Sequence, residues 1–239
     1  MGSYQMVFKR VEEKYILDVD KYNELMQKIK LKLVENEYPH SKILNIYYDT
    51  DKYDLAIKSI QKPTYKEKIR LRSYNVPKDD SKVFLELKRK CLGVVTKRRI
   101  GISLKNFNVY EEDRKLDINE SLQIYSEIDY VFKKYNLKPK IMVAYDRDSY
   151  YLEESKDIRI TFDSNLRSRL DDLNLKKGDY GDNFFDKDII IMEIKSCTAI
   201  PLWLVKILNE LKIYPSSFSK YGEIYKKYIA NKERKINYV

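Results

Sequence analysis

Residues 65–74 read Tyr-Lys-Glu-Lys-Ile-Arg-Leu-Arg-Ser-Tyr, and this stretch decides the fold. Basic residues occupy every second position, and alternate side chains of a β-strand lie on opposite faces of the sheet. The stretch therefore predicts a strand with Lys66, Lys68, Arg70 and Arg72 on one face and a partly apolar opposite face. In a single strand this pattern usually means that one face meets solvent.

The same alternation recurs on both sides of this stretch. Residues 83–90 and 94–104 follow it after short turn signals, and residues 8–16 repeat it near the N-terminus. Further strands are predicted at 43–49, 140–151, 157–163 and 189–195. Such a set predicts an antiparallel sheet whose basic side chains share one surface. A surface of this kind repels itself unless an anion binds to it, and the planar fork of arginine suits phosphate.

Four segments show helical periodicity, and residues 51–59 are predicted to form a short helical turn. One helix is predicted to follow an Asp18 or Asp20 cap and one to occupy residues 121–135; the other two begin at Pro201 and at about Ser219. The polar stretch 168–186 is predicted to be a long loop. Neither an internal repeat nor a linker rich in Gly or Pro divides the chain. We therefore expect a single α+β domain over residues 1–239.

Composition points to an anionic partner. The 239 residues include 47 Lys and Arg against 37 Asp and Glu, which gives a net charge of +10. Nucleic acid, a membrane surface and a phosphorylated ligand all fit this charge. The two cysteines form no disulfide framework, and neither an apolar N-terminal segment nor a run of 18 apolar residues occurs. These features predict a cytoplasmic protein without membrane insertion.

Common phosphate-handling motifs are missing. The sequence has no G-x-x-x-x-G-K-[ST] loop, no G-x-G-x-x-G and no H-R-D catalytic loop. The one histidine, His40, lies in a loop-like stretch and is interpreted as a surface residue. Asp49 is interpreted as a cap of the turn that follows it, and Trp203 as a packing residue. Phosphate binding in this chain must therefore depend on side chains carried by strands.

A set of short segments resembles, in order, the triphosphate tunnel metalloenzyme superfamily. Within that superfamily the set is most similar to the polyphosphate polymerase domain of the vacuolar transporter chaperone (VTC) family. The segments are residues 8–15, 45–50, 67–74, 85–88, 96–99, 144–147, 159–163, 192–195 and 218–221. The resemblance implies an eight-stranded antiparallel β-barrel, with flanking helices, that encloses a tunnel.

The resemblance also implies which residues act. The substrate-binding set is Arg10, Lys14, Lys68, Arg70, Arg72, Lys88, Lys97, Arg147, Arg159, Ser219 and Lys220. Four of these, Arg70, Arg72, Lys88 and Lys97, are the expected catalytic residues. Glu193 is the expected metal ligand. Glu12 and Glu86 are further metal candidates because of their strand parity.

The function implied is that of a metal-dependent polyphosphate polymerase. With Mn²⁺ or Mg²⁺, it would transfer the terminal phosphate of ATP, or of another nucleoside triphosphate, to a growing polyphosphate chain. Hydrolytic members of the superfamily open with E-x-E-x-K, whereas this chain has R-x-E-x-K at residues 10–14. The missing carboxylate weakens the case for a second metal that would activate water, which favours transfer over hydrolysis.

Two alternatives stay open at this point. The first is a triphosphatase on the same fold, which would split inorganic triphosphate or a nucleotide. The second is a non-catalytic module that binds polyphosphate or RNA, because 22 tyrosines could stack on bases. Several tyrosines, such as Tyr15 and Tyr125, fall on apolar positions where packing explains them better. This placement disfavours a nucleic-acid partner.

Overall fold

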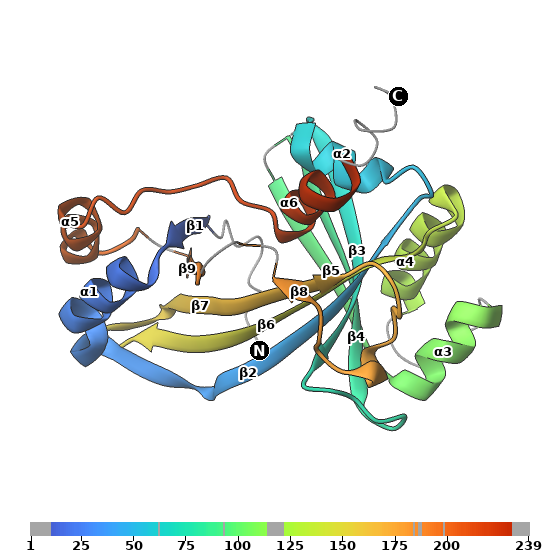
Figure 1. The fold of residues 1–239 in the computed structure, drawn as a ribbon, viewed down its shortest axis with the longest axis horizontal. Helices are drawn as coiled ribbons and strands as arrows, with labels where there is room; N and C mark the ends of the chain where they lie inside the picture. The colour runs from blue at the N-terminus through green and yellow to red at the C-terminus, as the bar shows by residue number, and fades with distance from the viewer. Residues whose placement is uncertain are drawn as a thin grey trace, which may run out of the picture. The chain divides into compact units, whose positions relative to one another are not determined.

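The computed structural model describes residues 11–61, 63–92, 94–113, 122–183, 185, 188–197 and 199–230. Arg10, an expected substrate-binding residue, lies outside these ranges. The described residues form an α+β fold with one large sheet (Figure 1). Its strands are β1 (Val11–Leu17), β2 (Leu33–Asp49), β3 (Tyr65–Tyr74), β4 (Lys82–Cys91), β5 (Val94–Ser103), β6 (Lys138–Leu152), β7 (Ser155–Arg169), β8 (Asp182–Asn183) and β9 (Ile190–Ser196).

The sheet follows the order β1-β9-β7-β6-β2-β3-β4-β5, and β8 pairs with β7. The pairs β1–β9, β7–β9, β7–β8, β2–β3, β3–β4 and β4–β5 are all antiparallel. The prediction of an α+β fold with an antiparallel sheet and flanking helices is confirmed. The order begins at β1 and ends at β5, so over the described residues the sheet is an open path and not the closed barrel expected.

Helices flank this sheet. They are α1 (Val19–Ile29), α2 (Asp54–Gln61), α3 (Leu104–Asp113), α4 (Leu122–Tyr135), α5 (Leu202–Glu210) and α6 (Lys220–Ile224), with the short turns η1 (Lys30–Lys32) and η2 (Leu175–Lys177) and the π-helix η3 (Tyr225–Ala230). Asp18 caps α1 as predicted, since its carboxylate accepts a hydrogen bond from the Lys21 amide at 2.8 Å. None of the described helices is long and apolar enough to cross a membrane.

Contacts divide the chain into two compact units, each made of three segments. Unit 1 comprises residues 1–41, 146–166 and 185–218, and unit 2 comprises residues 42–145, 167–184 and 219–239. Strands β2, β6 and β7 contribute residues to both units. The single domain over residues 1–239 stays a prediction.

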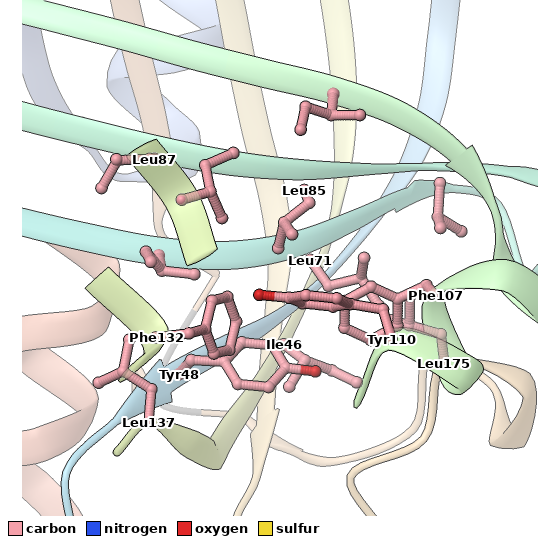
Figure 2. Packing of buried hydrophobic residues seen from close by; sticks show 14 of the residues in the cluster. Ile46, Tyr48, Leu71, Leu85, Leu87, Phe107, Tyr110, Phe132, Leu137 and Leu175 are labelled. Atoms are coloured by element: carbon pink, nitrogen blue, oxygen red, sulfur yellow. The ribbon is translucent and has the colours of Figure 1, made fainter. Parts of the chain in front are cut away.

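The core of unit 2 lies on the apolar face of β3, β4 and β5 (Figure 2). Leu71, Leu85 and Leu87 are at most 1% exposed, and they pack with aromatic residues of the helices, such as Phe107 of α3 and Phe132 of α4. Alternation explains this face, because these leucines occupy the positions between the charged residues. Lys68, Arg70, Arg72, Lys88, Lys97 and Arg99 occupy the alternate positions and are directed away from the core, whereas Arg89 and Arg98 lie on the core side and pair with Glu127 of α4.

The core of unit 1 is built in the same way from the apolar face of β1, β7 and β9. Phe162 and Ile194 pack there with Leu25 of α1 and Leu208 of α5. Trp203 lies partly buried against this cluster, and its indole Nε1 donates to Glu154 at 2.7 Å. Its packing role is therefore confirmed.

Several local features differ from the sequence-based expectations. Strand β2 begins ten residues before the predicted 43, and β7 extends into the predicted loop 168–186. Helix α3 was not predicted. His40 lies in β2 and not in a loop, although it is exposed as expected; its Nδ1 lies 2.7 Å from Asp148 Oδ1. The expected last helix is a short α6 followed by the π-helix η3 up to residue 230.

Candidate functional site

Unit 2 carries three lysines in one row across neighbouring strands. Lys68 of β3 lies opposite Lys88 of β4, and Lys88 lies opposite Lys97 of β5. We call these three residues the lysine row. Like charges directly opposite one another destabilise a sheet. Such a row is therefore suited to a polyanion that binds across it.

The next row along the same face holds a buried carboxylate among cations. Glu86 of β4 lies between Arg70 of β3 and Arg99 of β5, and it is 2% exposed. Its carboxylate accepts from Arg70 Nε at 2.8 Å and pairs with Lys97 at 2.7 Å and Arg99 at 3.2 Å. A fourth cation, Arg72, lies 3.9 Å away. This carboxylate is therefore committed to ion pairs with protein side chains.

The surrounding cations favour the ionised form of Glu86. Burial alone would raise the pKa of the Glu86 carboxyl, but Arg70, Arg72 and Lys97 outweigh burial and hold this pKa well below its usual value. Burial lowers the pKa of Lys97, and Glu86 offsets part of this effect. One carboxylate thus holds several cations on this face and leaves an excess of positive charge. We call the surface formed by the lysine row with Arg70, Arg72 and Arg99 the basic face.

Neutral side chains fix the two arginines of β3. Arg70 donates to the Tyr47 hydroxyl at 3.2 Å, and Arg72 Nε donates to Asn45 Oδ1 at 2.9 Å. Arg72 also donates to the Tyr145 hydroxyl at 3.2 Å. Sequence reasoning did not assign these three partners to the site. Tyr47 and Asn45 are placed by the register of β2 and β3, and Tyr145 comes from β6; alternation within one strand does not reveal either relation.

The start of α6 reaches the same face. Lys68 Nζ donates to Ser219 Oγ at 2.8 Å, and the same oxygen caps α6 by accepting from the Gly222 amide at 3.1 Å. Lys220 Nζ lies 4.5 Å from the centre of the Tyr145 ring. The predicted residues Ser219 and Lys220 are therefore brought to Lys68 and Tyr145.

A buried hydrogen-bond cluster holds α6 against α2. Asp49 accepts from the amides of Leu55 and Ala56 at 2.9 Å each and from the Tyr221 hydroxyl at 2.6 Å. Asp49 thus caps α2, as the sequence predicted. The hydrogen bond from Tyr221 links this cap to α6, next to the predicted site residue Lys220.

Unit 1 gathers a second charged cluster, on the polar face of β1, β9 and β7. One row aligns Glu12, Lys195 and Arg159, and the next aligns Lys14, Glu193 and Thr161. Lys195 Nζ lies 3.2 Å from Glu193, and Lys14 Nζ lies 3.2 Å from Glu12. These two rows hold three basic and two acidic residues, so carboxylates are a larger share of the charges here than on the β3–β5 face of unit 2.

Glu193 is ionised although it is buried. Burial alone would raise the pKa of its carboxyl, but the positive charges of Lys195, Lys14 and Arg147 outweigh burial and place this pKa well below its ordinary range. Arg147 contributes from 3.8 Å and is itself held by Asp163 through contacts of 2.6 and 2.8 Å. Asp163 was not singled out from the sequence.

The expected site residues therefore fall into two groups. Unit 2 holds Lys68, Arg70, Arg72, Glu86, Lys88, Lys97, Ser219 and Lys220, and unit 1 holds Glu12, Lys14, Arg147, Arg159 and Glu193. Arg159 Nε donates to Ser149 Oγ at 3.0 Å, which fixes the guanidinium in the second group.

The donor set of unit 1 fits a hard divalent cation. Glu12 and Glu193 offer neighbouring carboxylate oxygens, and the buried Thr161 hydroxyl, opposite Glu193, has no hydrogen-bond partner among the described residues. No group of three or more His, Cys, Asp or Glu side chains that could hold a metal occurs in the described part of the chain. Mg²⁺ commonly uses one or two carboxylates together with substrate phosphates and water, and this set matches that pattern.

Comparison with known proteins gives the family. The family model described as the VTC domain matches residues 9–229. The chain belongs to the VTC domain family. This VTC domain is 26% identical over 208 residues to vacuolar transporter chaperone complex subunit 4 of Schizosaccharomyces pombe. The match covers 70% of this chain and 29% of that protein, so the VTC domain described here spans about three-tenths of this relative's length.

Solved structures with this fold include two relatives of low identity. A candidate adenylate cyclase from Bacillus halodurans is 12% identical, with a TM-score of 0.54 over 88% of this chain and 93% of its own. An adenylyl cyclase candidate from Hippeastrum, described as having a dominant triphosphatase activity, is 15% identical, with a TM-score of 0.50 over 89% and 93%. At these identities the likeness shows the fold alone. The VTC domain therefore shares its fold with these two proteins.

Proposed function

We propose that this VTC domain is a metal-dependent polyphosphate polymerase. It transfers the terminal phosphate of ATP, or of another nucleoside triphosphate, to a growing polyphosphate chain. The observation that carries the proposal is the lysine row beside Arg70 and Arg72. Between the lysine row and the row of Arg72, the aligned residues of β3, β4 and β5 include a single acidic residue, Glu86, so positive charge is in excess there. A polyphosphate chain has the repeated negative charge that such a surface attracts.

The arginines of unit 2 give the basic face its geometry. Arg70 and Arg72 are held by Tyr47 and Asn45, so their guanidinium groups are oriented before a substrate binds. Preorganised donors of this kind lower the barrier because they do not reorient during the reaction. In this proposal they bind phosphate oxygens, and Lys88 and Lys97 stabilise the group that is transferred.

The carboxylates of unit 1 hold the metal in this proposal. Glu193 and Glu12 would bind Mg²⁺ or Mn²⁺, and Arg147 and Arg159 would bind phosphate oxygens beside them. When bound, such a cation offsets negative charge on the phosphates. Glu86 has a different role, because its ion pairs with Arg70 and Lys97 leave it to orient cations.

The reaction needs no nucleophile from the protein. A terminal phosphate oxygen of the acceptor chain attacks the γ-phosphorus of ATP, the bond from that phosphorus to the bridging oxygen breaks, and ADP leaves with that oxygen. Positioning and charge stabilisation supply most of the rate in reactions of this class. The side chains of the basic face provide both.

The test is incubation of the purified protein with ATP and Mn²⁺ or Mg²⁺, followed by sizing of the phosphate products on gels. We expect long chains from the wild type. Arg70→Ala and Lys88→Ala should each lower turnover by about 10²-fold or more, the scale of a lost transition-state contact. Arg98→Ala is the matched control, because Arg98 lies on the opposite face of β5 and pairs with Glu127 of α4.

The products also decide between the proposal and its alternatives. Orthophosphate without chain growth would replace the polymerase with a triphosphatase. Salt-sensitive binding of polyphosphate or RNA without metal-dependent turnover would leave a binding module. Near-wild-type turnover in both Arg70→Ala and Lys88→Ala would remove the basic face from the mechanism.

A further inference from the structure

One end of the basic face carries aromatic rings in place of lysines. Phe84 of β4 lies opposite Arg72 on one side and Gly101 on the other. The Arg99 guanidinium carbon lies 3.6 Å from the centre of the Phe84 ring, and Arg99 donates to the Tyr74 hydroxyl at 3.3 Å. The rings of Tyr74 and Phe84 meet edge to face at 5.7 Å. We call Tyr74, Phe84 and Arg99 the aromatic–arginine stack.

The stack does not belong to the hydrophobic core. Phe84 occupies the strand parity of Glu86 and Lys88, which is opposite to that of the buried Leu85 and Leu87. Tyr74 is 45% exposed, and the Arg99 side chain is 33% exposed. Phe84 is partly buried beneath Arg99, and Tyr74 and Arg99 present exposed planar groups that a ligand can contact.

The residue beside Phe84 on β5 is a glycine, and the side chain of Lys82 fills the space over it. Gly101 lies directly opposite Phe84, and a Cβ atom there would lie 2.4 Å from Lys82 Cε and 3.3 Å from Phe84 Cε1. Lys82 therefore lies across the glycine, with its Nζ 5.9 Å from the centre of the Phe84 ring. Both cations over Phe84, Lys82 and Arg99, are placed to accompany an aromatic ligand that carries negative charge.

We propose that the aromatic–arginine stack binds the nucleobase of the nucleoside triphosphate substrate. This inference rests on the proposed function. It adds a binding site for the nucleobase, whereas the basic residues bind only the phosphates. The base lies on the exposed surfaces of Tyr74 and Arg99, since guanidinium groups and aromatic rings both stack on bases. Because every base has a π-face, the subsite distinguishes nucleotides from inorganic phosphates and not one base from another.

The spacing along β4 suits this arrangement. Phe84 and Lys88 are four residues apart on one face, which corresponds to about 13 Å of extended strand. Arg72 lies in the row of Phe84, and Arg70, Glu86 and Arg99 form the row between Phe84 and Lys88. The ribose and the phosphates therefore run along the face from the stack toward the lysine row, with the terminal phosphate farthest from the base.

Two ligands that differ by the nucleoside test the subsite. The dissociation constants of ATP and of inorganic tripolyphosphate are measured by calorimetry with Mg²⁺, for the wild type and for Phe84→Leu and Arg99→Lys. We expect each substitution to weaken ATP about tenfold relative to tripolyphosphate, because Arg99→Lys removes a planar group on which the base stacks and Phe84→Leu removes the ring that holds that group in place. Arg99→Lys keeps the charge next to Glu86 and removes the planar group, so it separates stacking from charge.

Tyr130→Leu is the matched control. Tyr130 of α4 is 60% exposed and has Lys134 over its ring at 5.8 Å, but it lies on a helix that covers the opposite face of the sheet. We expect the ratio of the two dissociation constants to stay within twofold of the wild type. Saturation-transfer NMR gives a second readout, in which the adenine protons of ATP lose signal relative to the ribose protons in Phe84→Leu.

The outcomes separate this inference from the proposed function. Parallel weakening of ATP and tripolyphosphate in both variants, or an unchanged ratio, would overturn the nucleobase subsite and leave the phosphate face intact. If neither ligand binds the wild type, the proposed function fails and the subsite fails with it. A changed ratio without chain synthesis would support the subsite on an enzyme of different reaction type.

Discussion

At the scale of single residues, Glu86 shows how charge on this face depends on one carboxylate. Burial would raise its pKa, but Arg70, Arg72 and Lys97 hold it below the ordinary value of 4.5. A carboxyl group whose pKa is lower in the folded state contributes stability above its unfolded pKa, and this contribution is lost as the pH falls through the folded pKa. We therefore expect the free energy of unfolding to fall as the pH drops below about 4.5.

Glu86→Gln tests this expectation. The variant should lose about 3 kcal/mol at pH 7, because it leaves several cations without their buried partner. Its stability should also depend less on pH below 4.5 than that of the wild type. Urea unfolding at pH 3 to 7 measures both effects.

Glu210→Gln is the control for that series, since it removes an exposed ion pair with Lys28 that contributes at most about 1 kcal/mol. Equal slopes for the wild type and Glu86→Gln below pH 4.5 would contradict the assignment of Glu86 as the ionised centre of the face.

At the scale of elements, the lysine row places like charges opposite one another in β3, β4 and β5, and in the proposed function a bound polyanion offsets this repulsion. Lys88 lies between Lys68 and Lys97, and like charges opposite one another cost about 0.2–1 kcal/mol per pair. Lys88→Gln should therefore raise the melting temperature of the ligand-free protein at low salt. The same change should reduce the further rise caused by tripolyphosphate. Differential scanning calorimetry with and without the anion measures the two shifts.

Lys206→Gln on α5 provides the comparison, because this exposed lysine lies in unit 1 and outside the rows. A fall in the melting temperature of ligand-free Lys88→Gln, with an unchanged response to tripolyphosphate, would show that Lys88 serves the fold and not the anion.

Strands with strict alternation could be predicted closely from the sequence. The predicted 65–74 matches β3, and 83–90 and 94–104 match β4 and β5 within one residue at each end. The first ten residues of β2 were missed because they are exposed or only partly buried and include Pro39, so they lack an apolar period. Helix α3 was missed because Leu104, Phe107 and Tyr110 give it a short apolar stripe inside a mostly polar segment.

The candidate site could be predicted only as a set of residue types and faces. Parity correctly placed Lys68, Arg70 and Arg72 together, but it could not show which residues of β4 and β5 lie opposite them. Register between strands decides that Glu86 meets Arg70 and that Phe84 meets Arg72. The aromatic–arginine stack was missed for this reason, since its members come from three strands.

At the scale of the whole molecule, the net charge of +10 predicts stabilisation by polyanions. A ligand that binds only the folded state adds about 2.7 kcal/mol at a concentration one hundred times its dissociation constant. Tripolyphosphate should therefore raise the melting temperature, and added NaCl should reduce the rise because it screens exposed charges. Calorimetry at 20 and 300 mM NaCl measures this dependence.

Arg70→Ala combined with Arg72→Ala is the control for specific binding, because the double variant keeps most of the positive charge. An equal temperature rise in the double variant and the wild type would assign the stabilisation to general charge and not to the basic face.

The chain passes between the two compact units five times, at residues 41/42, 145/146, 166/167, 184/185 and 218/219. Dividing the chain at one position therefore cannot produce both units intact. An exchange of one unit with that of a relative must replace all three of its segments. Translation reaches Ser219 and Tyr221 last among the residues that contact Lys68 and Asp49. The three strands of the lysine row are therefore synthesised well before Ser219, the hydrogen-bond partner of Lys68. In the nascent chain, Lys68 lacks this partner until synthesis is nearly complete.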